Sequence, residues 1–189
     1  KERLPEKNRR NRRILKMEAY ELKIPRKRVA VLVGKNGKDK RYIERATGCK
    51  IDVNSEGEVI IKGEDNLKCY ECVNVARAIG RGCRPEVAMQ LTKEDNCSEI
   101  IDITNYSGKN KDKQKRIKGR IIGKEGKIRR TIEFLSETSI AVYGKTVCIV
   151  GHMENVSIAR NAVNDILKGA PHGPVLGVVE KKMKALRSF

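Results

Sequence analysis

The chain has 189 residues and carries 42 Lys and Arg against 24 Asp and Glu, which gives a net charge of +18. A surplus of that size attracts polyanions, so nucleic acid is the first partner to consider. No apolar run reaches the length of a membrane span and no signal-peptide pattern opens the chain, so we expect no membrane partner and a cytoplasmic location, nucleolar as well in a eukaryote.

A basic segment, residues 1–18, precedes the first predicted elements. The alternating stretch YELKI (20–24) is typical of a strand. A basic, aliphatic segment then leads into GKNG (34–37), and an amphipathic helix pattern follows the glycines. Two strands and a longer helix complete the series, with patterns at CKIDV (49–53), EVIIKG (58–63) and about 66–79.

The same series returns 89 positions later. The stretch GKNGKDKRYIE, from Gly34 to Glu44, matches GKEGKIRRTIE, from Gly123 to Glu133, at seven identical positions. Strand and helix patterns recur around it in the same order, at EIIDI (99–103), TSIAV (138–142), TVCIVG (146–151) and about 154–168. Two copies of a β-α-α-β-β-α unit therefore account for most of the chain.

Each glycine pair follows two aliphatic residues, begins with Gly-Lys and precedes a helix. This setting resembles the type I KH domain over residues 19–83 and 99–170. The resemblance implies an α+β fold of two tandem type I KH domains, with a linker at 84–98 and a C-terminal helix at 171–189. It also implies that each module clamps about four single-stranded nucleotides.

The glycine loops suit phosphate, because an anion can approach a glycine backbone closely and N–H groups at the start of the next helix attract it. We expect RNA to contact both loops and the residues beside them: Gly34, Lys35, Asn36, Gly37, Lys38, Lys40, Arg41, Lys118, Arg120, Ile122, Gly123, Lys124, Glu125, Gly126, Lys127, Arg129 and Arg130. For the bases we expect an apolar groove. Its second-unit candidates, which also suit a plain core, are Ile121, Ile122, Ile140 and Val142.

Two departures from the KH pattern are informative. Lys40 and Arg129 stand where an aliphatic residue is common, and Glu125 places an acid in the second loop. A tandem with the shared basic substitution, and with the tail GAPHGPVLGVVEKKM (169–183), resembles the small-ribosomal-subunit assembly factor of archaea and eukaryotes. That resemblance implies binding to the 3′ end region of small-subunit ribosomal RNA or its precursor, on the pre-small ribosomal subunit. It further implies a PIN-type endonuclease as partner, with a translation factor as a second candidate.

Positive charge is concentrated in the second unit. From Lys109 to Arg130 there are eleven Lys and Arg and two acids, a net charge of +9. Much of it comes from NYSGKNKDKQKR (105–116), an insertion absent from the first unit, which fits either a flexible solvated loop or phosphate contact. Because this run leads directly into the second glycine loop, we expect phosphate contact and a larger role for that loop.

Chemistry other than binding has weak support. Cys69 and Cys72 form a lone CxxC inside a helical pattern, which favours buried thiols over a zinc site, so we expect no metal and no cofactor. The stretch Gly144-Lys145-Thr146 lacks the first glycine of a P-loop, and no nucleophile stands beside a base. We therefore expect an RNA-binding protein and no enzyme. A KH protein of translation or RNA turnover, a DNA binder and a nuclease are the alternatives.

The last predicted element is the C-terminal helix, which places Val175, Val179, Met183 and Leu186 on one face. We expect this apolar stripe to pack across both units and to hold them as one rigid body. The alternative is a helix that docks a partner, since exposed apolar stripes also serve binding.

Overall fold

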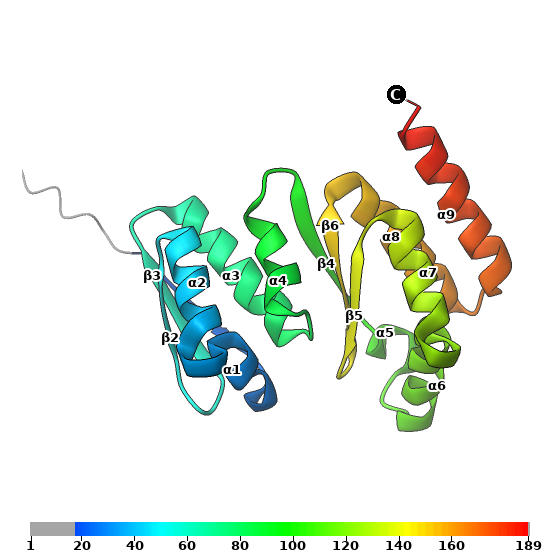
Figure 1. Ribbon diagram of the computed structural model, residues 1–189. Coiled ribbons are helices and arrows are strands. Elements are labelled where there is room, and N and C mark those ends of the chain that lie inside the picture. Colours follow the sequence, from blue (N-terminus) through cyan, green and yellow to red (C-terminus); the bar gives the residue numbers. More distant parts are fainter. Residues whose placement is uncertain (1–17, 189) are drawn as a thin grey trace, which may run out of the picture.

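The computed structural model describes residues 18–188 and consists of two units of the same order joined end to end (Figure 1). The basic segment expected at 1–18 lies outside these residues, apart from Glu18. The first unit comprises β1 (Glu18–Lys23), α1 (Arg26–Val33), η1 (Lys35–Gly37), α2 (Lys38–Thr47), β2 (Lys50–Val53), β3 (Glu58–Gly63) and α3 (Asn66–Gly80). The second comprises β4 (Asn96–Asp102), α5 (Thr104–Ser107), α6 (Lys111–Ile122), η3 (Lys124–Gly126), α7 (Lys127–Ser136), β5 (Ser139–Tyr143), β6 (Thr146–His152) and α8 (Met153–Lys168). The predicted α+β fold of two type I units is confirmed.

Each unit contains a three-stranded antiparallel sheet, ordered β1-β3-β2 in the first and β4-β6-β5 in the second. Its own helices cover one face of the sheet (Figure 1). The aliphatic positions that the repeat aligns are buried in both units: Leu32, Ile43, Ile51, Ile61 and Ile79 in the first, and Ile121, Ile132, Ile140, Ile149 and Ile166 in the second. Each copy of the repeat thus supplies the inward-facing side chains of its own core.

The insertion at 105–116 is largely helical, so its interpretation as a flexible loop is wrong. It contributes to α5 and to the first turns of α6. The Asn110 side chain caps α6 by accepting from the N–H of Lys113 at 2.9 Å, and the buried Gln114 amide donates to the carbonyl oxygen of Gly108 at 2.9 Å. This cap precedes a run of strong helix formers, Lys, Gln and Arg, so the segment extends the helix that enters the second loop.

The residues expected as a linker carry regular structure. They form the short helix α4 (Pro85–Ala88), the 3-10 turn η2 (Met89–Thr92) and the start of β4 at Asn96. Ala88, Met89 and Leu91 are buried in the core of the first unit. The connection is therefore packed against that unit along much of its length.

The two units share part of one core, and β6 is the element that joins them. Val147 and Ile149 point into the core of the second unit, whereas Cys148 and Val150 point the other way and are buried in the core of the first. All residues from Thr146 to Gly151 are buried. The outer face of the second sheet is therefore the surface on which the first unit packs.

The C-terminal helix α9 (His172–Leu186) packs on α7 and α8, and the prediction that it spans both units is wrong (Figure 1). Val175, Val179 and Met183 are buried in the core of the second unit, and Leu186 is partly buried beside them. The predicted apolar face is correct. This face packs on the second unit alone, because the outer face of the second sheet already joins the two units. The helix α9 therefore covers the apolar surface of α7 and α8 that would otherwise be exposed.

We expect Val179→Ala to lower the free energy of unfolding by about 2 kcal/mol, because the buried side chain loses two methyl-sized groups and leaves a cavity. Val178→Ala is the matched control on the same helix, since Val178 is 51% exposed and should change stability by less than about 0.5 kcal/mol. Urea unfolding followed by circular dichroism measures both. Equal effects of the two variants would contradict the packing of α9.

Candidate nucleic-acid interface

The two glycine loops have nearly the same backbone shape. Gly34 has φ 71° and ψ 173°, and Gly123 has φ 73° and ψ 177°. Gly37 has φ 75° and ψ 17°, and Gly126 has φ 77° and ψ 14°. In Figure 1, α2 and α7 both rise from their loops in the same direction. The repeat in sequence is therefore a repeat in three dimensions, and both loops lie toward the same edge of the molecule.

The first glycine of each loop has no room for a side chain. A Cβ on Gly34 would lie 2.8 Å from the backbone nitrogen of Asp39, and one on Gly123 would lie 2.9 Å from that of Ile128. The following helices, α2 and α7, have no side-chain cap at their N-termini. Their first-turn N–H groups and the helix dipole consequently favour an anion at the loop.

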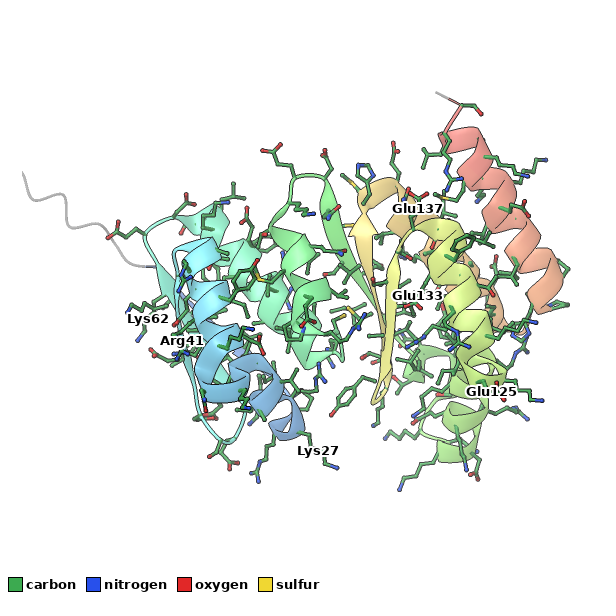
Figure 2. All side chains as sticks on the ribbon, in the orientation of Figure 1. Lys27, Arg41, Lys62, Glu125, Glu133 and Glu137 are labelled. Atoms are coloured by element: carbon green, nitrogen blue, oxygen red, sulfur yellow. The ribbon has the colours of Figure 1, made fainter. Side chains whose placement is uncertain are left out.

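The two loops differ in the position of their acid. Asp39 lies in the first turn of α2 with its carboxylate beside Gly34, whereas the corresponding residue of α7 is Ile128, which packs against the second core. The first turn of α7 contains no acid. Glu125 in the second loop is exposed at the start of α7 (Figure 2). Each loop therefore has one acid near the start of its helix, Asp39 inside α2 and Glu125 just before α7.

Eight of the seventeen predicted contact residues are exposed, and the other nine are half-buried. Figure 2 labels Arg41 and Glu125 among the exposed ones, which are Lys35, Asn36, Lys38, Arg41, Lys124, Glu125, Lys127 and Arg130. Two residues of α6 have other partners. The Lys118 ammonium donates to the carbonyl oxygen of Gly144 at 3.1 Å, which ties α6 to the β5–β6 hairpin. The Arg120 guanidinium donates to the carbonyl oxygen of Ala170 at 2.6 Å. Arg120 thus anchors the connection between α8 and α9, and its contact with RNA stays a prediction.

Lys40 and Arg129, the shared departures from the KH pattern, form ion pairs with the acid one helical turn later. The Lys40 ammonium is 3.4 Å from a carboxylate oxygen of Glu44, and Nε of Arg129 is 3.6 Å from one of Glu133. Both glutamates also accept a hydrogen bond from a backbone N–H of a strand.

Glu44 accepts from the backbone N–H of Ile51 at 2.9 Å, and Glu133 accepts from that of Ile140 at 2.7 Å. Figure 2 shows Glu133 on α7. Each acid therefore joins the helix after the loop to the edge strand of its sheet. The two basic residues pair with these carboxylates and so support the groove between helix and strand, and their contact with RNA stays a prediction.

The groove of the second unit runs between α7 and β5 and encloses about 440 Å³. Of the predicted groove residues, Ile121 and Ile140 are buried, whereas Ile122 and Val142 are half-buried, and Val142 lines the groove. β5 is an edge strand. The N–H of Ile140 points out of the sheet toward Glu133, so by the antiparallel alternation the backbone of Val142, two residues on, also faces outwards.

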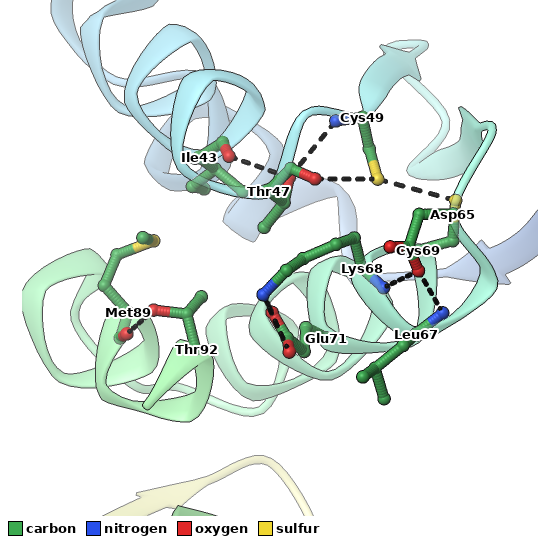
Figure 3. Close-up of polar contacts among 10 residues, drawn as sticks. All are labelled: Ile43, Thr47, Cys49, Asp65, Leu67, Lys68, Cys69, Glu71, Met89 and Thr92. Atoms are coloured by element: carbon green, nitrogen blue, oxygen red, sulfur yellow. Dashed lines mark hydrogen bonds and ion pairs between the residues drawn. The ribbon is translucent and has the colours of Figure 1, made fainter. Parts of the chain in front are cut away.

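The cysteines of the first unit are buried, as predicted for Cys69 and Cys72. Figure 3 shows the Sγ atoms of Cys49 and Cys69, which are 3.4 Å apart beside Thr47. Burial raises the pKa of Cys72 to about 12, so this thiol stays protonated near neutral pH. Within residues 18–188, no group of three or more His, Cys, Asp or Glu is placed to hold a metal ion, and no helix is long and apolar enough to cross a bilayer.

Comparison with known proteins places the chain in a family. A model described as "Eukaryotic type KH-domain (KH-domain type I)" matches residues 97–184, and one described as "KH domain" matches residues 19–78. The crystal structure of Dim2p from Pyrococcus horikoshii is 40% identical with a TM-score of 0.80, and the match covers 87% of this chain and 99% of that one. This chain belongs to the Dim2p family of tandem KH-domain proteins. Its two loops are therefore those of two KH domains.

Other members of the Dim2p family extend the comparison. A KH domain-containing protein of Methanocaldococcus jannaschii is 42% identical over 88% of this chain and 74% of its own length. In the crystal structure of the a/eIF2alpha-aDim2p-rRNA complex of P. horikoshii, aDim2p is 40% identical with a TM-score of 0.83, covering 89% of this chain and 96% of that one. Pre-rRNA-processing protein PNO1 of Yarrowia lipolytica is 32% identical over 64% of this chain. The match spans about half of the PNO1 length, 48%.

We expect Gly123→Ala to destabilise the chain by about 2 kcal/mol, because alanine at positive φ is strained and its Cβ would lie 2.5 Å from Cγ1 of Ile128. Gly119→Ala is the control. Gly119 lies inside α6 with no atom within 4 Å of its would-be Cβ, so this change should stabilise by about 0.5–1 kcal/mol. Thermal unfolding of both variants checks the opposite signs.

Proposed function

We propose that this chain binds single-stranded RNA at the 3′ end region of small-subunit ribosomal RNA, or of its precursor, during ribosome assembly. The observation that carries the proposal is the pair of glycine loops of matching backbone shape, each leading into a helix without a side-chain cap. The likeness to aDim2p, whose crystal structure includes rRNA, supports ribosomal RNA as the target. The loops would hold the RNA backbone, with the bases over the groove beside β5 in the second unit.

The setting that we propose is the pre-small ribosomal subunit, in the cytoplasm, and in the nucleolus as well in a eukaryote. The relatives named as pre-rRNA-processing proteins support this setting. The P. horikoshii complex with a/eIF2alpha supports a translation factor as a partner and keeps a role in translation as the second candidate function. A PIN-type endonuclease is a further proposed partner, because a protein that holds the RNA 3′ end presents the substrate of an enzyme that trims it.

Crosslinking in cells, followed by sequencing of the bound RNA, separates these functions. Reads concentrated at the 3′ end of small-subunit rRNA and its precursor are expected for an assembly factor. Reads spread over messenger RNAs would contradict that proposal and favour the alternative in translation or RNA turnover.

The chain is proposed to bind RNA without cleaving it. Purified protein incubated with labelled single-stranded RNA should leave the RNA intact in the presence of Mg²⁺ and of Mn²⁺, the ions that metal-dependent nucleases use. Gel electrophoresis measures the intact fraction. Cleavage that follows the protein through purification would contradict the proposal.

The second loop should contribute more affinity than the first. We expect Lys124→Asp to weaken RNA binding by at least about tenfold near 0.1 M salt, because it places a second acid beside Glu125 at the start of α7. The double change Lys35→Asp with Asn36→Asp should weaken it less, since the second loop adjoins the basic run from Lys109 to Arg130, whose net charge is +9. Each phosphate that a variant no longer binds should also reduce the slope of log affinity against log salt by about 0.7.

Fluorescence anisotropy across a salt series, with circular dichroism of each variant, makes the measurement. Lys93→Asp is the control, because it makes the same charge change in the exposed turn between η2 and β4, at the opposite edge of the molecule from the loops (Figure 1). Folded loop variants that bind as tightly as the control variant would contradict the clamp. A larger effect of the first loop would contradict only the order of the two loops.

A further inference from the structure

The groove of the second unit has a wall formed by the connection after α3, which packs against the first unit and is counted with it. Arg129 and Glu133 of α7 line one side and β5 lies along the groove, while Gly82, Arg84 and Val87 line the other side. Its volume of about 440 Å³ lies within the range of roughly 300–1,000 Å³ that is typical of ligand sites. A strand that follows β5 would therefore meet residues of both units.

This wall is held firmly against β5. Arg28 of α1 donates from Nε to the carbonyl oxygen of Ile79 at 2.7 Å and from Nη2 to that of Cys83 at 2.5 Å. Its guanidinium lies 5.5 Å from the centre of the Tyr143 ring, at the end of β5. Gly82 permits the close approach, because a Cβ there would lie 2.5 Å from Cβ of Tyr143. The segment beside the groove thus has a fixed position relative to the second unit.

Arg84 is the cation of this wall whose side chain is left for a ligand. Its backbone is fixed, since its carbonyl oxygen accepts from the N–H groups of Val87 and Ala88 at 3.1 and 3.0 Å at the start of α4. Its side chain is exposed and makes no hydrogen bond or ion pair with any residue in the described range 18–188. In contrast, Arg129 across the groove is paired with Glu133. Arg84 therefore adds to this groove a positive charge that no acid in the described part of the chain pairs with.

We propose that Arg84 is an RNA-binding residue of the second unit's groove and pairs with a backbone phosphate of the strand that lies along β5. A guanidinium matches the geometry of phosphate with two parallel hydrogen bonds. RNA is the occupant that the observations favour, because the groove adjoins the helix of the second glycine loop and is bordered by the free edge of β5. The inference rests on the proposed function and extends it, since the first unit then adds affinity through a residue outside its own loop.

The test compares Arg84→Ala with Arg77→Ala, using as probe the 3′-terminal twelve nucleotides of an archaeal small-subunit rRNA. Arg77 is an exposed arginine of α3 in the same unit that does not line the groove, so both variants lose one charge. Arg84→Ala should weaken binding about tenfold and reduce the salt slope by about 0.7, because one phosphate is no longer neutralised. Arg77→Ala should change affinity less than twofold. Arg84→Lys should recover part of the affinity, because it restores the charge without the planar fork.

Thermal unfolding should be unchanged in Arg84→Ala, since only the backbone of this residue bonds within the described part of the protein. Equal weakening by Arg84→Ala and Arg77→Ala would overturn the proposed phosphate pairing and leave only a general effect of charge. An affinity unchanged in Arg84→Ala while Lys124→Asp binds weakly would also overturn the pairing, and the proposed function would stand. If Lys124→Asp had no effect either, the proposed function would fail together with the inference.

Discussion

Burial of the second sheet on both faces is the constraint that arranges the rest of the molecule. Val147 and Ile149 of β6 complete one core while Cys148 and Val150 complete the other, so neither unit can move away without exposing apolar surface. Within residues 18–188 the first sheet has no such covering: Lys62, labelled in Figure 2, and Asp52 form an ion pair on its open face, with side chains 43% and 64% exposed. The two units have the same fold, but among the described residues only the second sheet is covered on both faces. For this reason the groove beside β5 is lined by α7 on one side and by the connection after α3 on the other.

The position of the units follows from that packing and determines what the RNA can meet. Because the first unit packs on the outer face of the second sheet, the connection after α3 lies beside the edge strand β5. Gly82 allows the backbone to lie against Tyr143, and Arg28 fixes the turn that follows α3. A short packed connection with Pro85 at the start of α4 then leaves Arg84 at the groove. Tandem arrangement thus changes the second binding surface itself in addition to joining two binding modules.

The sequence is enough to predict both cores and both loops, because they rest on local periodicity and on a repeat that aligns residue by residue. It does not predict contacts between distant segments. Arg120, expected at the RNA, bonds Ala170, fifty residues away, and nothing in the spacing of α6 distinguishes these roles. The helix in the insertion is hard to predict because its lysines equally suit a solvated loop, although Asn110 supplies a cap signal. The unbroken apolar run VCIV (147–150) indicates a strand that is buried on both faces. That burial explains why the first unit packs on β6 and not on the C-terminal helix.

The shared basic departures, Lys40 and Arg129, connect the fold to the binding surface. In each unit the helix after the loop must stay at a set distance from an edge strand, and a carboxylate from the helix satisfies one backbone N–H of that strand. A half-buried acid in a chain of net charge +18 would face the same phosphates that the loop attracts. Pairing it with a cation one turn earlier neutralises that repulsion locally and keeps the acid oriented. The residues that break the common KH pattern therefore allow an acid to shape the groove without opposing the RNA, while the exposed cations at the loops and at Arg84 supply the attraction.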